Sequence, residues 1–127
     1  MPHITIQYSA NIEPRADIQA FCEALRAAAA SLDIFPANGV RVRALPSEYY
    51  AIADGNPDNA FVDISVRLRE GRALAARQRA TEALFAAAKE FLADVIATQP
   101  IMLSMEMRNI DAELAPKLNT IRERLRV

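Results

Sequence analysis

The 127-residue chain carries 15 lysines and arginines against 16 aspartates and glutamates, so it lacks the basic excess with which nucleic-acid-binding proteins displace counterions. Its composition, 52% apolar and 24% charged, predicts one globular domain over residues 1–127. A single histidine and a single cysteine exclude an internal disulfide and a metal site of ordinary ligand number. No secretory signal or membrane-length apolar run is visible, so we expect a cytoplasmic protein with no nucleic-acid or membrane partner.

The first eight residues alternate between apolar and polar side chains, which predicts a half-buried strand. Its apolar face comprises Ile4, Ile6 and Tyr8, and its polar face comprises His3, Thr5 and Gln7. If Met1 is removed after synthesis, the chain begins with the secondary amine of Pro2 at the edge of a sheet. Such an amine can act as a base.

Apolar side chains recur at helical spacing over residues 18–32 and predict an amphipathic helix. After Pro36 and the turn at Gly39, residues 40–45 alternate between valines and arginines, which predicts a second strand. A strand, a helix and a strand in succession require the two strands to be parallel, with a right-handed crossover.

Residues 46–59 predict a long loop, and its adjacent Tyr49 and Tyr50 could either wall a pocket or cover a hydrophobic edge. A third strand is predicted over 60–68, a long helix over 73–97 and a fourth strand over 101–107. The tail that follows contains a possible short helix over 119–125 and could pack on a partner.

These elements predict an α+β fold in which two β-α-β units form one four-stranded sheet with both helices on one face. We expect the other face to carry Thr5 or Ile4, Arg41 or Val40, and a row of apolar residues from the later strands. Mostly parallel sheets seldom leave a face to water, so another subunit is expected to cover it.

Most catalytic templates are absent, because the chain has no Ser-His-Asp set, no metal ligands and no glycine-rich phosphate loop. What remains is the Pro2 amine together with arginines that follow glycines, Arg41 with Arg43 nearby and Arg72. Arginines close to an amine would bind an anionic substrate and lower the pKa of the amine, as a general base requires. The alternative is that Pro2 only starts an edge strand and the arginines are solvated.

Several short motifs, in order and at compatible spacing, resemble the 5-carboxymethyl-2-hydroxymuconate isomerases of the tautomerase superfamily. The matching segments are Met1-Pro2-His3, Tyr8 to Ile12, Ile34-Phe35-Pro36, Gly39 to Arg43, Ala53-Asp54-Gly55, Ala60-Phe61-Val62, Gly71-Arg72 and Arg77-Gln78. The resemblance runs from Pro2 to about Leu114. This chain departs from it in having no tryptophan in the segment of Pro46, Tyr49 and Tyr50.

The resemblance implies a homotrimer whose sheets face inward, with no cofactor. It implies that Pro2 is the general base that converts a conjugated 2-hydroxymuconate-type dienol into its keto isomer, in the breakdown of hydroxylated phenylacetates. Arg41 and Arg72 would hold carboxylates of a dicarboxylate or tricarboxylate and stabilise the dienolate, with Arg43 and Tyr50 as further substrate-binding candidates.

Two other functions stay open. One is hydration or dehalogenation of an unsaturated acid, for which Glu106 is the candidate carboxylate that would activate water. The other is a non-catalytic trimer that binds small anions through the same arginines.

Overall fold

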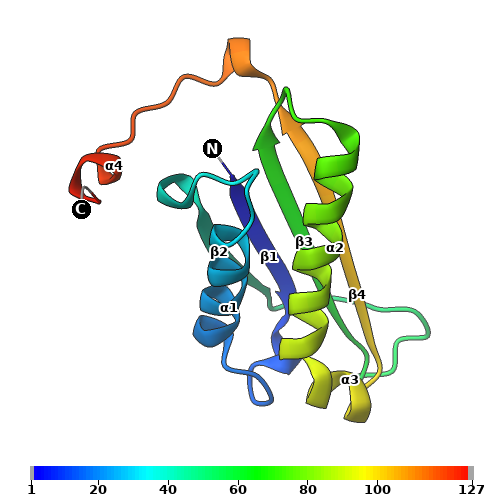
Figure 1. Ribbon diagram of the computed structural model, residues 1–127. Helices are drawn as coiled ribbons and strands as arrows, with labels where there is room; N and C mark the ends of the chain where they lie inside the picture. Colours follow the sequence, from blue (N-terminus) through cyan, green and yellow to red (C-terminus); the bar gives the residue numbers. More distant parts are fainter. Residues whose placement is uncertain (1, 126–127) are drawn as a thin grey trace.

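The computed structural model describes residues 2–125. Its four strands are β1 (His3–Ser9), β2 (Arg41–Ser47), β3 (Ala60–Arg69) and β4 (Ile101–Ile110), arranged in the order β2-β1-β3-β4 (Figure 1). β1 pairs in parallel with β2, and β3 pairs in parallel with β4. The two units join through an antiparallel pairing of β1 with β3. The predicted pair of β-α-β units in one sheet is confirmed, and each predicted strand is present.

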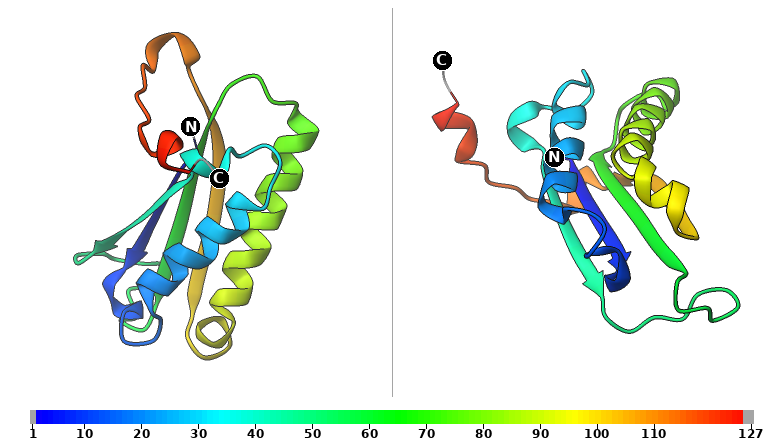
Figure 2. Two further views of the ribbon diagram at one scale, coloured as in Figure 1. Left: turned by 60° about the vertical axis from the view of Figure 1, so that its left-hand side comes forward. Right: turned by 90° about the horizontal axis from the view of Figure 1, so that it is seen from below.

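Both long helices, α1 (Ile18–Ala30) and α2 (Leu74–Phe91), cover the same face of the sheet (Figure 2). Asp17 caps the start of α1, because its side chain accepts a hydrogen bond from the backbone nitrogen of Ala20 and so satisfies one free amide of the first turn. The short elements are η1 (Ala10–Ile12), η2 (Ala37–Gly39), α3 (Ala93–Thr98), η3 (Ala112–Leu114) and α4 (Ile121–Arg124).

The predicted single helix over 73–97 is wrong, because the chain bends at Leu92 and continues as α3. A straight helix of that length would extend about 37 Å, beyond the roughly 33 Å of a strand the length of β3. The bend keeps both Leu92 and Val95 buried against the sheet and returns the chain to the start of β4. The fourth strand also continues beyond its predicted end, to Ile110.

The core lies between the helices and the inner face of the sheet. In it the predicted inner side chains of β1 and β3 are buried: Ile4, Ile6, Tyr8, Val62, Ile64, Val66 and Leu68. From the helices, Phe21 of α1 stacks on Phe91 of α2 with 5.0 Å between ring centroids. Burial of one such apolar side chain contributes about 1.5–3 kcal/mol, so this layer fixes the position of the strands.

The outer face of the sheet differs from expectation, because its middle is polar. In the pairing register, Thr5 of β1 lies beside Arg43 and Ser65, and Glu106 lies beside Ser65. The methionines Met105 and Met107 of β4 pack against the core. Apolar residues occupy both odd and even positions of β4, so its sequence alone does not say which set faces the core. The pairing of β4 with β3 decides this.

The chain after β4 crosses the end of the sheet from one edge to the other (Figure 1). The backbone nitrogen of Ala112 donates to Oε1 of Glu70, next to the end of β3. Farther on, Nδ2 of Asn119 donates to the carbonyl oxygen of Asn38 in η2, which precedes β2. The tail is thus attached at both sides of the sheet. Within residues 2–125, no helix is long and apolar enough to cross a membrane.

Candidate active site

Pro2 and Arg41 meet where β1 and β2 begin. The backbone nitrogen of Arg41 donates to the carbonyl oxygen of Pro2 at 3.3 Å, and the Pro2 side chain is fully buried. Nε of Arg41 also donates to the carbonyl oxygen of Gly39, in the turn that leads into β2. The parallel pairing of two strands therefore brings together the two residues that the sequence singled out separately.

A row of basic side chains crosses the outer face of the sheet beside Pro2. His3 is paired with Arg41 on one side and with Arg67 on the other, and Arg67 is paired with Arg108. Arg43 reaches the same row, because its Nη1 lies 3.4 Å from Nδ1 of His3. These groups face one way because residues opposite one another in a sheet project to the same side.

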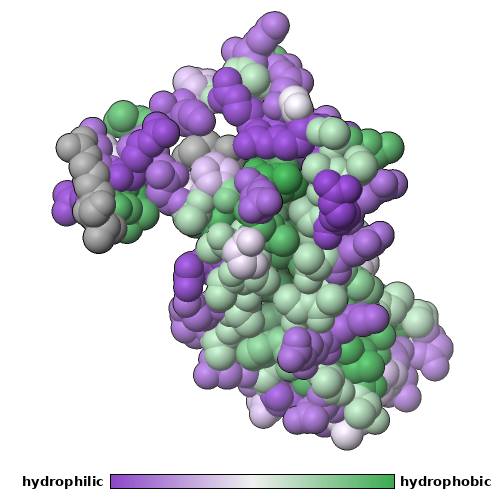
Figure 3. Space-filling model, viewed as in Figure 1, coloured by the Kyte–Doolittle hydropathy of each residue, from purple (hydrophilic) through white to green (hydrophobic). Residues whose placement is uncertain are grey.

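The pKa of His3 reflects its burial and the positive charges of this row. It is lowered from 6.5 to about 4 by burial of the ring and then by the charges of Arg41, Arg67 and Arg43. Between residues 2 and 125 the single ion pair joins Arg26 to Glu23, on α1, so no carboxylate forms an ion pair with the row. Hydrophilic residues gather at this end of the molecule (Figure 3).

A cavity of about 350 Å³ lies between this row and the tail. It is lined by His3, Arg41, Arg67, Arg69, Ile110, Ala115, Pro116, Lys117 and Leu118. Four of these side chains are cations, one is the neutral imidazole, and none is a carboxylate. Pro2 does not itself line the cavity, but its neighbour His3 and its partner Arg41 do. The chemistry of the lining suits an anion of small-molecule size.

Arg72 lies at the same end of the sheet but outside the cavity lining. Its Nη1 donates to the carbonyl oxygen of Arg69 at 3.1 Å, and its own carbonyl accepts from Nε of Arg77. Gly71 before it has φ +113°, a conformation that favours glycine, and this turns the chain from β3 towards α2. The end of β3 lies opposite the start of β1, so Arg72 and Pro2 share one end of the fold.

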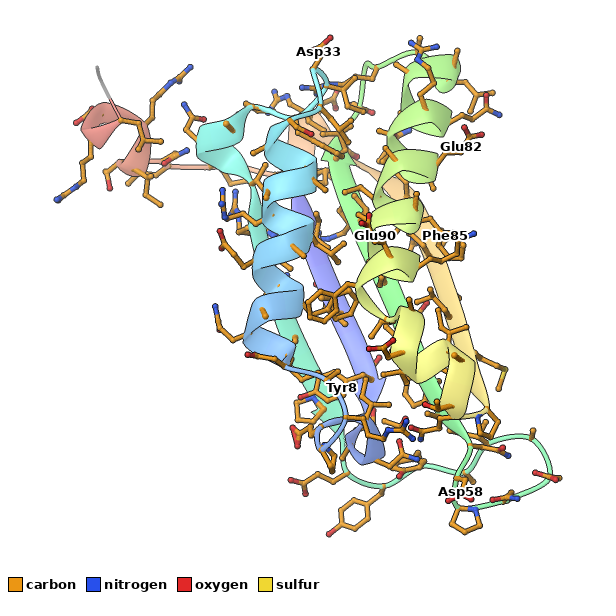
Figure 4. All side chains as sticks on the ribbon, turned by 60° about the horizontal axis from the view of Figure 1, so that its bottom comes forward. Tyr8, Asp33, Asp58, Glu82, Phe85 and Glu90 are labelled. Atoms are coloured by element: carbon orange, nitrogen blue, oxygen red, sulfur yellow. The ribbon has the colours of Figure 1, made fainter. Side chains whose placement is uncertain are left out.

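Tyr50 is not brought to Pro2 within one chain. β2 ends at Ser47, paired with Ser9 at the far end of β1, and the tyrosines follow it there. Figure 4 shows this far end, where Tyr8 of β1 and Asp58 of the loop lie. Tyr49 is 93% exposed and Tyr50 is 37% exposed, so Tyr49 covers no hydrophobic edge of this chain. A contact of Tyr50 with the Pro2 site would need a second copy.

Glu106, the candidate carboxylate for activating water, is exposed on the outer face and does not line the cavity. It lies opposite Ser65, two residues along the strand from the row that contains Arg67. In the described part of the chain, no three metal-ligating side chains cluster together. The site therefore offers cationic and amine groups rather than a carboxylate or a metal centre.

Sequence reasoning missed Arg67, Arg69 and Lys117. The alternation of residues 60–68 indicated that Arg67 faces away from the core, whereas Arg69 was expected in the turn and instead ends β3. The missing information was the antiparallel pairing of β3 with β1, which puts Arg67 next to His3, and the path of the tail, which brings Lys117 over the cavity.

Two parallel β-α-β units, joined by an antiparallel pair with a basic cavity where the first strand begins, define a protein of the tautomerase fold. The model of the 5-carboxymethyl-2-hydroxymuconate isomerase family matches residues 2–125. The chain belongs to this family and is an isomerase.

Relatives of known name cover nearly the whole chain. The chain is 31% identical over 121 residues to a 5-carboxymethyl-2-hydroxymuconate Delta-isomerase of Escherichia coli, covering 95% of this chain and 96% of that protein. A crystal structure of a 5-carboxymethyl-2-hydroxymuconate delta-isomerase matches with a TM-score of 0.93 at 28% identity, over 100% of this chain and 94% of that one. The corresponding isomerase from Deinococcus radiodurans R1 matches with a TM-score of 0.89 at 34% identity, over 99% and 95% of the two chains.

Proposed function

We propose that this isomerase acts on 5-carboxymethyl-2-hydroxymuconate, or a closely similar unsaturated polycarboxylate, with the nitrogen of Pro2 as general base once Met1 has been removed. The observation that carries the proposal is the pairing of a buried Pro2 with Arg41 beside an uncompensated basic cavity. The family match begins at Pro2 and its named relatives are isomerases of this substrate. The reaction would belong to the catabolism of hydroxylated phenylacetates in the cytoplasm.

The surroundings of Pro2 favour a neutral amine. Burial disfavours a charged group, and nearby positive charges disfavour an additional one, so both effects lower the pKa of an amine. His3, the next residue, experiences both effects, and its pKa falls to about 4. The same burial and the same arginines would keep the Pro2 amine unprotonated near neutral pH, as a general base requires.

The proposed reaction moves one proton. The lone pair of the Pro2 nitrogen takes the proton of the substrate 2-hydroxyl, and the oxygen electrons form the keto group as negative charge spreads along the diene. The ammonium then returns the proton to a distant carbon, which restores a neutral amine. Arg41 and Arg72 would stabilise the dienolate and hold carboxylates, and such electrostatic stabilisation is commonly a large part of catalysis. Arg43 and Tyr50 would assist in binding.

We also propose that the protein works as a homotrimer whose sheet faces turn inward. Among residues 2–125, no helix lies over the outer face of the mixed sheet (Figure 2). Leu45 and Met102 at its far end are 49% and 56% exposed, and a neighbouring copy would cover them. Such a copy could also bring Tyr50 to the site of its neighbour.

The test compares the processed protein with Pro2→Ala by following the ultraviolet absorbance of the conjugated dienol. The mass of each preparation first establishes that Met1 is absent. We expect the variant to lose most of its kcat, because a primary amine of different basicity replaces the ring nitrogen. Equal rates for the two proteins would refute the role of Pro2, and binding without turnover by the processed protein would favour a non-catalytic anion-binding trimer.

A further inference from the structure

The cavity beneath the tail contains more positive charge than the proposed proton transfer uses. Arg41 is assigned to the dienolate, whereas Arg67, Arg69 and Lys117 line the same cavity and have no assigned role. Ion pairing does not explain them, because the one ion pair formed within residues 2–125 is that of Arg26 with Glu23. Three uncompensated cations in one cavity indicate a site for a further anionic group.

The strand order separates these cations from Arg41, whereas Arg67 lies directly beside His3 of β1. Arg41 is on β2 and Arg67 is on β3, with β1 between them, so two strand spacings or about 10 Å separate their backbones. Arg69 lies two residues farther along β3 on the same face, towards the tail. An anion that contacts both Arg41 on one side and Arg67 and Arg69 on the other would need a negative group at each end.

The tail completes the cavity from the other side. Its attachment to Glu70 and Asn38 brings residues 115–118 over the outer face of the sheet, with Lys117 among the lining residues. Ala115, Pro116 and Leu118 add an apolar wall next to Ile110. An apolar wall with cations at one end suits a short hydrocarbon arm that ends in a carboxylate.

We propose that Arg67, Arg69 and Lys117 form a specificity subsite for the carboxymethyl carboxylate of the substrate, on the β3 side of the cavity and across β1 from Arg41. This proposal rests on the proposed function, because it assumes the substrate 5-carboxymethyl-2-hydroxymuconate. The muconate part of that substrate has two carboxylates, and the carboxymethyl arm has the third. The subsite separates tricarboxylates from dicarboxylates, and it leaves the proton transfer to Pro2 and Arg41. The lowered pKa of His3 agrees with it, because Arg67 contributes to that shift.

The first experiment measures KM and kcat of Arg67→Gln, Arg69→Gln and Lys117→Gln with 5-carboxymethyl-2-hydroxymuconate and with 2-hydroxymuconate, which lacks the third carboxylate. We expect KM for the tricarboxylate to rise about tenfold or more in Arg67→Gln and Arg69→Gln, the range for loss of a charged hydrogen bond, and KM for the dicarboxylate to change less than twofold. Arg79→Gln, at an exposed position of α2, is the control of equal charge change. Lys117→Gln alters only an exposed tail residue, so its folding is not in question.

An equal rise for both substrates, or no rise for either, would overturn the subsite. A second measurement tests the subsite without any turnover, so its result does not depend on whether Pro2 is the base. Calorimetry follows the binding of propane-1,2,3-tricarboxylate, glutarate and inorganic phosphate to the wild type and the same variants. We expect the three variants to weaken only the tricarboxylate, whereas phosphate binding as tightly as the tricarboxylate would show a general anion pocket and overturn the assignment. If Pro2→Ala keeps full activity, the proposed base fails while this binding result still stands.

Discussion

His3 lies directly opposite Arg41 in the parallel pairing of β1 with β2, one residue after the buried Pro2. This pairing holds the only histidine of the chain among Arg41, Arg43 and Arg67. Among these arginines, an additional positive charge on His3 is unfavourable. The same arginines are proposed to keep the Pro2 amine neutral, so one electrostatic environment affects both the stability of the fold and the proposed base.

The first prediction concerns the pH dependence of stability. The pKa of His3 in the folded protein, about 4, is below the ordinary value of 6.5, so His3 binds a proton more tightly in the unfolded chain. The contribution of His3 is therefore fully present above about pH 6.5 and is lost as the pH falls from there towards 4. We expect urea unfolding midpoints of the wild type to decrease over this window more steeply than those of His3→Gln. Parallel curves for the two proteins would contradict the assigned environment.

Arg41→Ala is expected to raise KM for the dienol by tenfold or more, since a charged hydrogen bond to a carboxylate contributes on the order of a factor of ten or greater. Steady-state kinetics by absorbance would measure it. Arg79→Ala, at an exposed position of α2, serves as the control and should leave both kcat and KM within twofold. An unchanged KM in Arg41→Ala would remove the binding role of Arg41.

Arg72→Ala is expected to lower kcat, with or without a change in KM, because its charge would act on the dienolate that forms during the reaction. The side chain also donates to the carbonyl oxygen of Arg69, so Tm must be measured beside the kinetics. Arg72→Lys keeps the charge and should recover part of the rate. A variant that loses Tm but keeps kcat would indicate that Arg72 only fixes the turn after β3.

Leu84→Ala in α2 is expected to cost about 2–5 kcal/mol in the free energy of unfolding, because Leu84 is completely buried in the core. Leu74→Ala, in the first turn of the same helix, is the matched control. Leu74 is 61% exposed, and its loss should change stability by about 0.5 kcal/mol or less. Chemical denaturation distinguishes the two, and similar costs would mean that α2 does not pack on the sheet through the Leu84 face.

The sequence was sufficient for the β-α-β units because each element had its own periodicity. Alternation in the first eight residues and in residues 60–68 assigned the core faces of β1 and β3, and helical spacing assigned those of α1 and α2. Periodicity does not specify which strands are neighbours. The pairing of β1 with β3 therefore emerged only from the structure, and with it the contact of His3 with Arg67.

The parts that the sequence did not predict depend on contacts between distant segments. The bend at Leu92 follows from the length of the sheet that the helix must cover, and the path of the tail follows from its attachment at Glu70 and Asn38. Pro2 and Arg41 were singled out by residue type and by the family resemblance. Lys117 carried no comparable signal, because a lone lysine in a polar tail is typical of a solvated side chain.

The most direct test of the central claim measures turnover against the fraction of chains that begin at Pro2. Protein produced with methionine removal inhibited is treated with an aminopeptidase for increasing times, and each sample is assayed by dienol absorbance and by intact mass. In a chain that retains Met1, the Pro2 nitrogen is part of an amide and has no lone pair available for proton transfer. We predict no turnover at zero processing and a rate proportional to the processed fraction; a full rate from chains that retain Met1 would contradict the account.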